Sequence, residues 1–192
     1  MYKLCKSERS AARQRELEEG LLFAMEASRY EDISVSDLCR QMNIPRKSFY
    51  RYFESKDGAL HALIDHTLME FELFDQVEKY ETRTALHALE RFFLFWTHHD
   101  RLLNALRSSG LSGVLIQRGI AQALNEGTAF QRLSPLDSDY MKEQATTFAV
   151  CGLMSILVQW HATGCRHSPQ EMAQLTAHLL TRPLFPNPNA IL

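Results

Sequence analysis

Every apolar pattern in this sequence repeats with the period of an α-helix, and no segment alternates as a β-strand would. Near the N-terminus, for example, Leu17, Leu21 and Met25 recur on one helical face. Helix start signals divide the chain, and the clearest is Ser168 with Glu171 three residues later, the pattern of a capping box. The sequence therefore predicts an all-α chain of about nine helices, over residues 8–29, 34–42, 45–53, 56–79, 84–98, 100–108, 111–125, 138–164 and 169–181.

The helix lengths predict two unequal parts. Residues 1–55 are expected to form a small three-helix unit, and residues 56–192 a larger helical bundle. A hydrophobic content of 45% is enough to bury a core in such a chain. The formal net charge of -2 gives no indication of nucleic-acid binding, but residues 40–56 carry five basic residues against the single acid Glu54. A mildly acidic chain thus carries one compact basic patch.

Two short helices joined by a tight turn are expected over residues 34–53. Ser34 can cap the first helix, and Asn43 occupies the turn, where a left-handed backbone is needed and Asn tolerates it. Pro45 then stands at a favoured first position of the second helix. This order of elements is typical of a helix-turn-helix, whose second helix enters the major groove of DNA.

The second short helix separates its residues onto two faces. Phe49 and Phe53 are expected to face the interior and fasten the helix to its neighbours. The outward residues are basic or hydroxylic, which suits guanine edges and phosphate oxygens; they are Arg46, Lys47, Ser48, Tyr50 and Arg51. Lys56 adds a positive charge in the first turn of the next helix. From the positions of these residues around the helix alone, a basic face that is simply solvated remains the alternative to DNA binding.

The segment "ISVSDLCRQMNIPRKSFYRYFESKDGALHALI" resembles the helix-turn-helix signature of the tetracycline-repressor (TetR, TetR/AcrR-like) family of bacterial transcription regulators. Asn43 replaces the turn glycine that is common in that family, and Lys47 occupies a position that the family usually keeps small. The matching positions are Ser34, Val35, Cys39, Asn43, Ile44, Ser48, Phe49, Tyr50, Tyr52, Phe53, Ser55, Lys56 and Leu60.

This resemblance implies a homodimeric repressor that binds a palindromic operator in double-stranded DNA and is released by a small-molecule effector. It implies phosphate contacts for Ser34, Tyr50 and Lys56. The residues nearest the bases would be Arg46, Lys47 and Ser48, and Arg51 could take either role. It also implies that the last two helices form the dimer and that the helices between them and the head enclose the effector.

An aromatic stripe on the helix expected over 84–98 has two interpretations, a packed core or the lining of an effector pocket. If it lines a pocket, His99 is its polar group, and Met141 and Phe148 on a later helix are candidates for the facing wall. The residues of the stripe itself are Leu89, Phe92, Phe95 and Trp96.

The helix expected over 138–164 contains no Lys, Arg, Asp or Glu between Gln144 and Cys165. Its polar residues favour a buried packing helix over a membrane span, so no membrane partner is expected. Its small residues would allow close approach of a second helix, and residues 157–175 resemble the last helix pair of several TetR-family members. The candidate dimer residues are Ala149, Gly152, Ser155 and Trp160.

The remaining sequence features favour a regulator over an enzyme. The four cysteines are scattered and the N-terminus lacks the apolar run of a signal peptide, so a cytoplasmic location with free thiols is expected. His161, Cys165 and His167 form only a weak candidate for a metal site, because no fourth ligand is evident. No metal and no cofactor are therefore predicted. A redox role for Cys151 or Cys165 stays open.

No phosphate-binding loop, nucleophile elbow or zinc-protease motif occurs in the sequence, so no catalytic residue is assigned. The alternative function is a co-regulator of the same fold, whose C-terminal part binds a partner protein instead of a small ligand.

Overall fold

The computed structural model describes residues 1–5, 7–76, 84–126 and 138–182. Within these ranges the chain forms nine α-helices and one short 3-10 turn, Tyr30–Asp32, and no β-strand beyond an isolated bridge. The expected all-α class is confirmed. In chain order the helices are α1 (Glu8–Ala27), α2 (Val35–Gln41), α3 (Arg46–Tyr50), α4 (Lys56–Gln76), α5 (Ala85–Thr97), α6 (Asp100–Ser108), α7 (Ser112–Glu126), α9 (Asp139–Ala162) and α10 (Pro169–Thr181).

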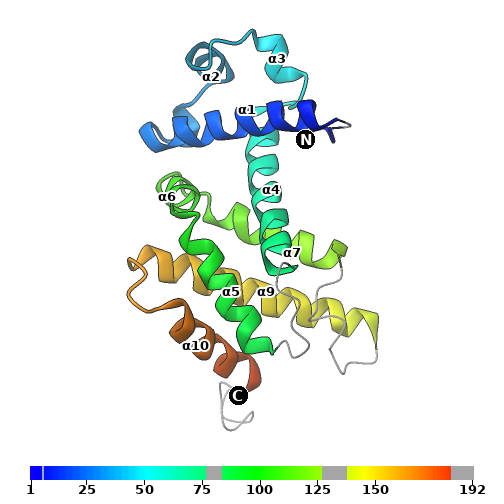
Figure 1. Ribbon diagram of the computed structural model, residues 1–192, viewed down its shortest axis with the longest axis vertical. Helices are drawn as coiled ribbons and strands as arrows, with labels where there is room; N and C mark the ends of the chain where they lie inside the picture. The colour runs from blue at the N-terminus through cyan, green and yellow to red at the C-terminus, as the bar shows by residue number, and fades with distance from the viewer. Residues whose placement is uncertain (6, 77–83, 127–137, 183–192) are drawn as a thin grey trace, which may run out of the picture.

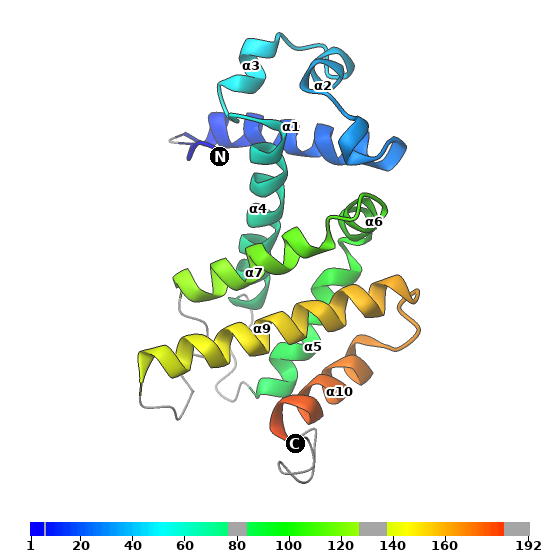
Figure 2. The same cartoon turned by 180° about the vertical axis from the view of Figure 1, so that it is seen from behind.

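The helices divide into a small head and a larger body. Figure 1 shows α1, α2 and α3 at one end, with α4 running from them into the body formed by α5, α6, α7, α9 and α10. In the body, α7 packs along α9, and α5 packs along α10 (Figure 2). The expected division at residue 55 therefore falls at the start of α4. The last residues of the helix expected over 56–79 lie outside the described residues.

Hydroxyl side chains cap the N-termini of several helices where the sequence predicts them. The Ser34 hydroxyl accepts the backbone N–H of Asp37 at 3.1 Å and begins α2. At α10, the Ser168 hydroxyl accepts the N–H of Glu171 at 3.2 Å, and the Glu171 carboxylate accepts the N–H of Ser168 at 2.7 Å. The first N–H groups of a helix have no partner within it, so these bonds fix where each helix begins.

The turn between α2 and α3 has the backbone that the sequence predicts. Asn43 has a φ of 52°, in the left-handed region. The Ile44 N–H donates to the Cys39 carbonyl at 2.9 Å and the Asn43 N–H donates to the Arg40 carbonyl at 3.1 Å. This pair of bonds closes α2 as a Schellman motif and turns the chain sharply into α3.

The helix α3 is shorter than predicted, and Pro45 caps it instead of occupying its first position. Its expected last residue, Phe53, lies beyond the end of α3, where it stands opposite Tyr2 in the isolated antiparallel bridge, although its N–H still donates to the Phe49 carbonyl at 3.1 Å. We call residues 1–5 the N-terminal strap. No periodic pattern in the sequence marks this segment, so its pairing was not predicted.

The N-terminal strap runs past the end of α3 and the start of α4. The Lys3 N–H donates to the Tyr52 carbonyl at 3.0 Å, and the Glu54 N–H donates to the Met1 carbonyl at 3.1 Å. A Cβ atom built on Gly58 would lie 2.4 Å from the Met1 carbonyl oxygen. Only glycine therefore lets the strap lie this close to the first turn of α4.

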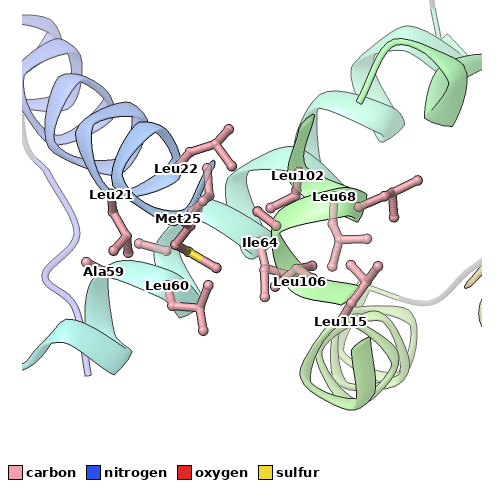
Figure 3. Packing of buried hydrophobic residues seen from close by; sticks show 14 of the residues in the cluster. Leu21, Leu22, Met25, Ala59, Leu60, Ile64, Leu68, Leu102, Leu106 and Leu115 are labelled. Atoms are coloured by element: carbon pink, nitrogen blue, oxygen red, sulfur yellow. The ribbon is translucent and has the colours of Figure 1, made fainter. Parts of the chain in front are cut away.

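A continuous apolar core joins the head to the body (Figure 3). Leu21 and Met25 of α1 pack against α4 in the head, and Ile64, further along α4, lies beside α6 and α7. Leu106 of α6 and Leu115 of α7 continue the same cluster and are fully buried. The apolar cores of the head and the body are therefore one packed cluster, through which a displacement of α6 would reach α1 and α4.

Candidate nucleic-acid interface

The two aromatic anchors of α3 are buried as predicted. Phe49 is 1% exposed and Phe53 is 0% exposed, and their ring centroids lie 5.2 Å apart. Tyr52 is buried beside them, whereas Tyr50 is 41% exposed on the outer side. Both anchors pack in the head core, so α3 is held with a defined face toward the solvent.

The positive charges on the outer face of α3 have no acidic partner among the described residues. Arg46, Lys47 and Arg51 are exposed, and none of the ion pairs among the described residues includes them. The Arg46 guanidinium lies 5.8 Å from the centre of the Tyr50 ring and donates to its hydroxyl at 3.4 Å. Arg46 therefore projects outward with Tyr50, as predicted for a residue in the first turn, and Ser48 lies half-buried between the two faces.

Ser34 and Lys56, at the edges of this surface, have partners within the protein. The Ser34 hydroxyl donates to the Asp37 carboxylate at 2.5 Å, and this bond lowers the pKa of Asp37. Lys56 donates to the carbonyl oxygens of Tyr30 and Ile33, the second at 2.5 Å. Lys56 thus holds the fold locally, and its predicted phosphate contact would use the donor that remains of its three N–H groups.

The predicted effector stripe on α5 is packed as core. Leu89, Phe92, Phe95 and Trp96 are each at most 9% exposed. Phe71 of α4 fills the space beside them, with its ring centre 5.5 Å from that of Phe92 and 5.4 Å from that of Phe95. Of the two interpretations that the sequence left open, the packed core is the one observed.

Met141 and Phe148, which the sequence analysis predicts as the facing wall of a pocket, are exposed on α9. Met141 is 51% exposed and Phe148 is 72% exposed. The inner face of α9 is formed instead by Thr146 and Leu157, which are fully buried. Phe148 is two residues from Thr146, so it points to nearly the opposite side of the helix.

The predicted dimer residues divide between the two faces of α9. Gly152 and Ser155 are exposed and share the outer face with Phe148. Ala149 and Trp160 are buried within the chain, 7% and 4% exposed. The Trp160 indole N–H donates to the His167 carbonyl at 3.0 Å, which explains its inward orientation.

A cleft of about 350 Å³ lies between α1, α4 and α6, away from the aromatic stripe. Its lining combines apolar leucines with charged side chains from all three helices, including Arg15, Glu18, Glu70 and Arg101, and with the imidazole of His99 at the start of α6. His99 is the one predicted effector residue in this lining. Its ring stacks on Phe95 at 4.1 Å, and its Nε2 lies 3.8 Å from the Glu70 carboxylate, an interaction that is the main cause of the lowered pKa of Glu70.

The other candidate groups have ordinary surroundings. His161 of α9 bonds to the Asp100 carboxylate at 2.8 Å, and within the described ranges no three metal-ligating side chains gather at one point. Cys165 is exposed, and partial desolvation together with the nearby charge of Asp100 raises the pKa of its thiol, which disfavours the reactive thiolate. Among the described helices, α9 alone has the length and mean hydropathy of a membrane span, and 33% of that window is buried in the fold.

A polar network missed by the sequence analysis connects the strap, α4 and α7. Asp65 of α4 is 5% exposed. Its carboxylate accepts the Tyr2 hydroxyl at 2.8 Å and the Arg118 Nε at 2.6 Å, and a second Arg118 nitrogen completes a two-pronged ion pair. The network therefore ties the segment beside α3 to a helix of the body.

This network predicts a loss of stability at alkaline pH. Burial and the bond to Asp65 raise the pKa of Tyr2 from 10.0 to about 12. Its contribution is fully present below pH 10 and is lost as the pH rises toward 12, because the unfolded chain loses the phenolic proton first. Urea unfolding at about pH 9 and about pH 11 should show a larger loss of stability for the wild type than for Tyr2→Phe. Parallel losses in the two proteins would contradict the prediction.

Comparison with known proteins shows what fold this is. No protein-family profile matches the chain, and no curated protein matches its sequence. The solved structure of the dihydroxyacetone kinase operon activator DhaS is similar over 88% of this chain and 93% of that chain, with 17% identity and a TM-score of 0.56. The fatty acid degradation regulator FadR from Bacillus halodurans is similar over 94% of this chain and 98% of its own, with 14% identity and a TM-score of 0.58.

A tetR-family transcriptional regulator from Streptomyces coelicolor is also similar, over 88% of this chain and 79% of that chain, with 17% identity and a TM-score of 0.55. These similarities cover both the head and the body. The chain therefore has the fold found in these transcriptional regulators.

Proposed function

From this fold, that of the TetR-type transcriptional regulators, we propose that the protein is a sequence-specific DNA-binding regulator of the bacterial cytoplasm and acts as a homodimeric repressor. The observation that carries the proposal is α3, a helix fastened by Phe49 and Phe53 that exposes Arg46, Lys47 and Arg51 without acidic partners. A surface of this kind fits the negatively charged major groove, where basic side chains neutralise phosphates and read guanine edges.

The proposed dimer places two copies of α3 in successive major grooves of a palindromic operator, about 34–36 Å apart. Support for the dimer comes from exposed apolar side chains on the last two helices. Phe148 and Gly152 lie on the outer face of α9. On α10, Leu175, Leu179 and Leu180 are 48%, 36% and 38% exposed. Burial of such surfaces in an isologous contact is the usual stabilising term of a homodimer.

The proposed effector site is the cleft between α1, α4 and α6 instead of the filled stripe on α5. Its volume of about 350 Å³ lies within the range of small-molecule sites. An occupant would contact the head through Arg15 and the body through Arg101, so it would favour one relative position of the two. A ligand that binds one conformation more tightly shifts the population toward it, and this would release the operator.

Selection from a library of random double-stranded DNA tests the proposed function. The expected result is one palindromic site, bound by two chains and weakened steeply by salt in a gel-shift assay. Absence of any salt-sensitive, sequence-specific complex would contradict DNA regulation. Recovery of a stoichiometric partner protein by a chain that binds no small molecule would instead support the co-regulator alternative.

Substitutions on α3 should separate base reading from phosphate binding. Lys47→Ala is expected to change which operator bases are preferred, because a base contact contributes about 1–3 kcal/mol of discrimination. Tyr50→Phe is expected to weaken all sequences alike by about five-fold, the effect of one lost phosphate hydrogen bond. Binding to a panel of single-base operator variants measures both effects. An unchanged order of preference in Lys47→Ala would exclude a reading role for that residue.

A further inference from the structure

Tyr30 lies at the junction of the head, α4 and α6. It begins the 3-10 turn between α1 and α2 and is 9% exposed. Each of its three polar groups has a partner in another element, and these partners are Ser109, Asp57 and Lys56. We call these four residues the Tyr30 junction.

The link from Tyr30 to α6 is a hydrogen bond from its backbone N–H to a side chain. The Tyr30 N–H donates to the Ser109 hydroxyl at 3.0 Å, across 79 residues of sequence. Ser109 caps the C-terminus of α6, and Gly110 follows it with a φ of 68°. The Leu111 N–H then closes the turn on the Leu106 carbonyl at 2.7 Å. The hydroxyl that holds Tyr30 is therefore fixed to the end of α6 by a rigid turn.

The links from Tyr30 to α4 use its side chain and its carbonyl. The phenol donates to the Asp57 carboxylate at 2.5 Å, in the first turn of α4. The Lys56 ammonium donates to the Tyr30 carbonyl and lies 4.1 Å from the centre of its ring. Burial and the bond to Asp57 raise the pKa of Tyr30 well above its ordinary value, which keeps the phenol a donor.

The opposite end of α6 is also tied, on one side to the head and on the other to the body. Arg101 donates to the Glu19 carboxylate of α1 at 2.6 Å and to both oxygens of Glu26. Asp100 accepts from His161 of α9 at 2.8 Å. A shift of α6 that follows α9 would therefore move α1 at one end and Tyr30 at the other.

We infer that the Tyr30 junction is a positioning element for DNA reading, which fixes the angle of each head relative to α6 and hence the distance between the two copies of α3. This inference rests on the proposed function, because the distance matters only to a dimer that reads two half-sites. Tyr30 and Ser109 do not belong to the DNA-facing surface. Their loss should therefore change the preferred spacing of half-sites and leave the base preference within each half-site as it was.

Ser109→Ala tests the junction, because it removes one hydroxyl at a partly exposed position. The readout is the affinity for the selected operator divided by the affinity for the same operator with one base pair inserted between its half-sites. This ratio is expected to fall by about five-fold in Ser109→Ala, the effect of one lost hydrogen bond, and in the same direction in Tyr30→Phe. Hydrogen exchange at the Tyr30 amide should become faster in Ser109→Ala.

The matched control is Ser108→Ala. This neighbouring hydroxyl donates only within its own helix, to the Ala105 carbonyl at 3.1 Å, so the spacing ratio should stay at the wild-type value. The inference is overturned if the Tyr30 amide exchanges faster in Ser109→Ala while the spacing ratio stays at the wild-type value. It is also overturned if the spacing ratio falls equally in Ser109→Ala and Ser108→Ala. A wild-type protein that forms no specific complex would overturn the proposed function itself, and the inference with it.

Discussion

Replacing Lys47 and Arg51 together by glutamate is expected to weaken operator binding by at least about 100-fold. Both side chains are exposed on α3. Two contacts with the DNA would be lost, and two negative charges would face the phosphates in their place. The slope of log affinity against log salt should become shallower, since positive charges that displace counterions from the DNA are lost.

Fluorescence anisotropy of labelled operator over a series of salt concentrations measures both quantities. The matched control reverses two exposed arginines outside the head, as Arg107→Glu with Arg166→Glu, and gives the same change of net charge. This control is expected to retain most of the wild-type affinity, because the effect of a distant charge is screened at physiological salt. Equal losses in the two double variants would show that net charge, and not α3, determines the binding.

Asp65→Ala is expected to lower the free energy of unfolding by about 3 kcal/mol. The carboxylate is the shared acceptor of Tyr2 and Arg118, so its removal leaves a partly buried guanidinium and a phenol without their partner. In a chain of this size, that loss corresponds to a decrease of about 6–12 °C in Tm. The end of the molecule that carries α3 should also become more mobile, because the N-terminal strap loses the hydrogen bond from Tyr2 to α4.

Chemical denaturation with linear extrapolation measures this loss. The double variant Asp65→Ala with Arg118→Met is expected to recover part of the stability, since breaking one side of such a pair costs more than removing both. Glu16, whose ion pair with Arg13 lies on the exposed surface of α1, provides the control, and Glu16→Ala should leave Tm unchanged. A loss below about 1 kcal/mol in Asp65→Ala would mean that water replaces the carboxylate.

Local signals in the sequence were sufficient for the existence of the helices, for the caps at Ser34 and Ser168 and for the turn at Asn43, but not for the bounds of α3. These features depend on residues a few positions apart, such as Ser168 with Glu171. The inner face of α3 was predicted for the same reason, because Phe49 and Phe53 are four residues apart and sit on one side of the chain.

The orientation of whole helices depends on contacts that are distant in sequence. A helical wheel shows that Phe148 shares a face with Gly152, but it does not show which face of α9 packs on α7. This is why the exposed position of Phe148 and the buried positions of Ala149 and Trp160 were not predicted. The N-terminal strap and the Tyr30 junction were missed because their hydrogen bonds join residues up to 79 positions apart and follow no period.

The N-terminal strap has a practical consequence for work with the purified protein. Because the Met1 carbonyl contacts the Glu54 N–H and fits against Gly58, any residues fused ahead of Met1 would emerge directly beside the end of α3. An affinity tag placed there would crowd the proposed operator-binding surface, and a weakened gel shift would then be an artefact of the expression vector. Tags for binding assays belong after α10, whose last residues Figure 1 shows at the far end of the molecule from α3.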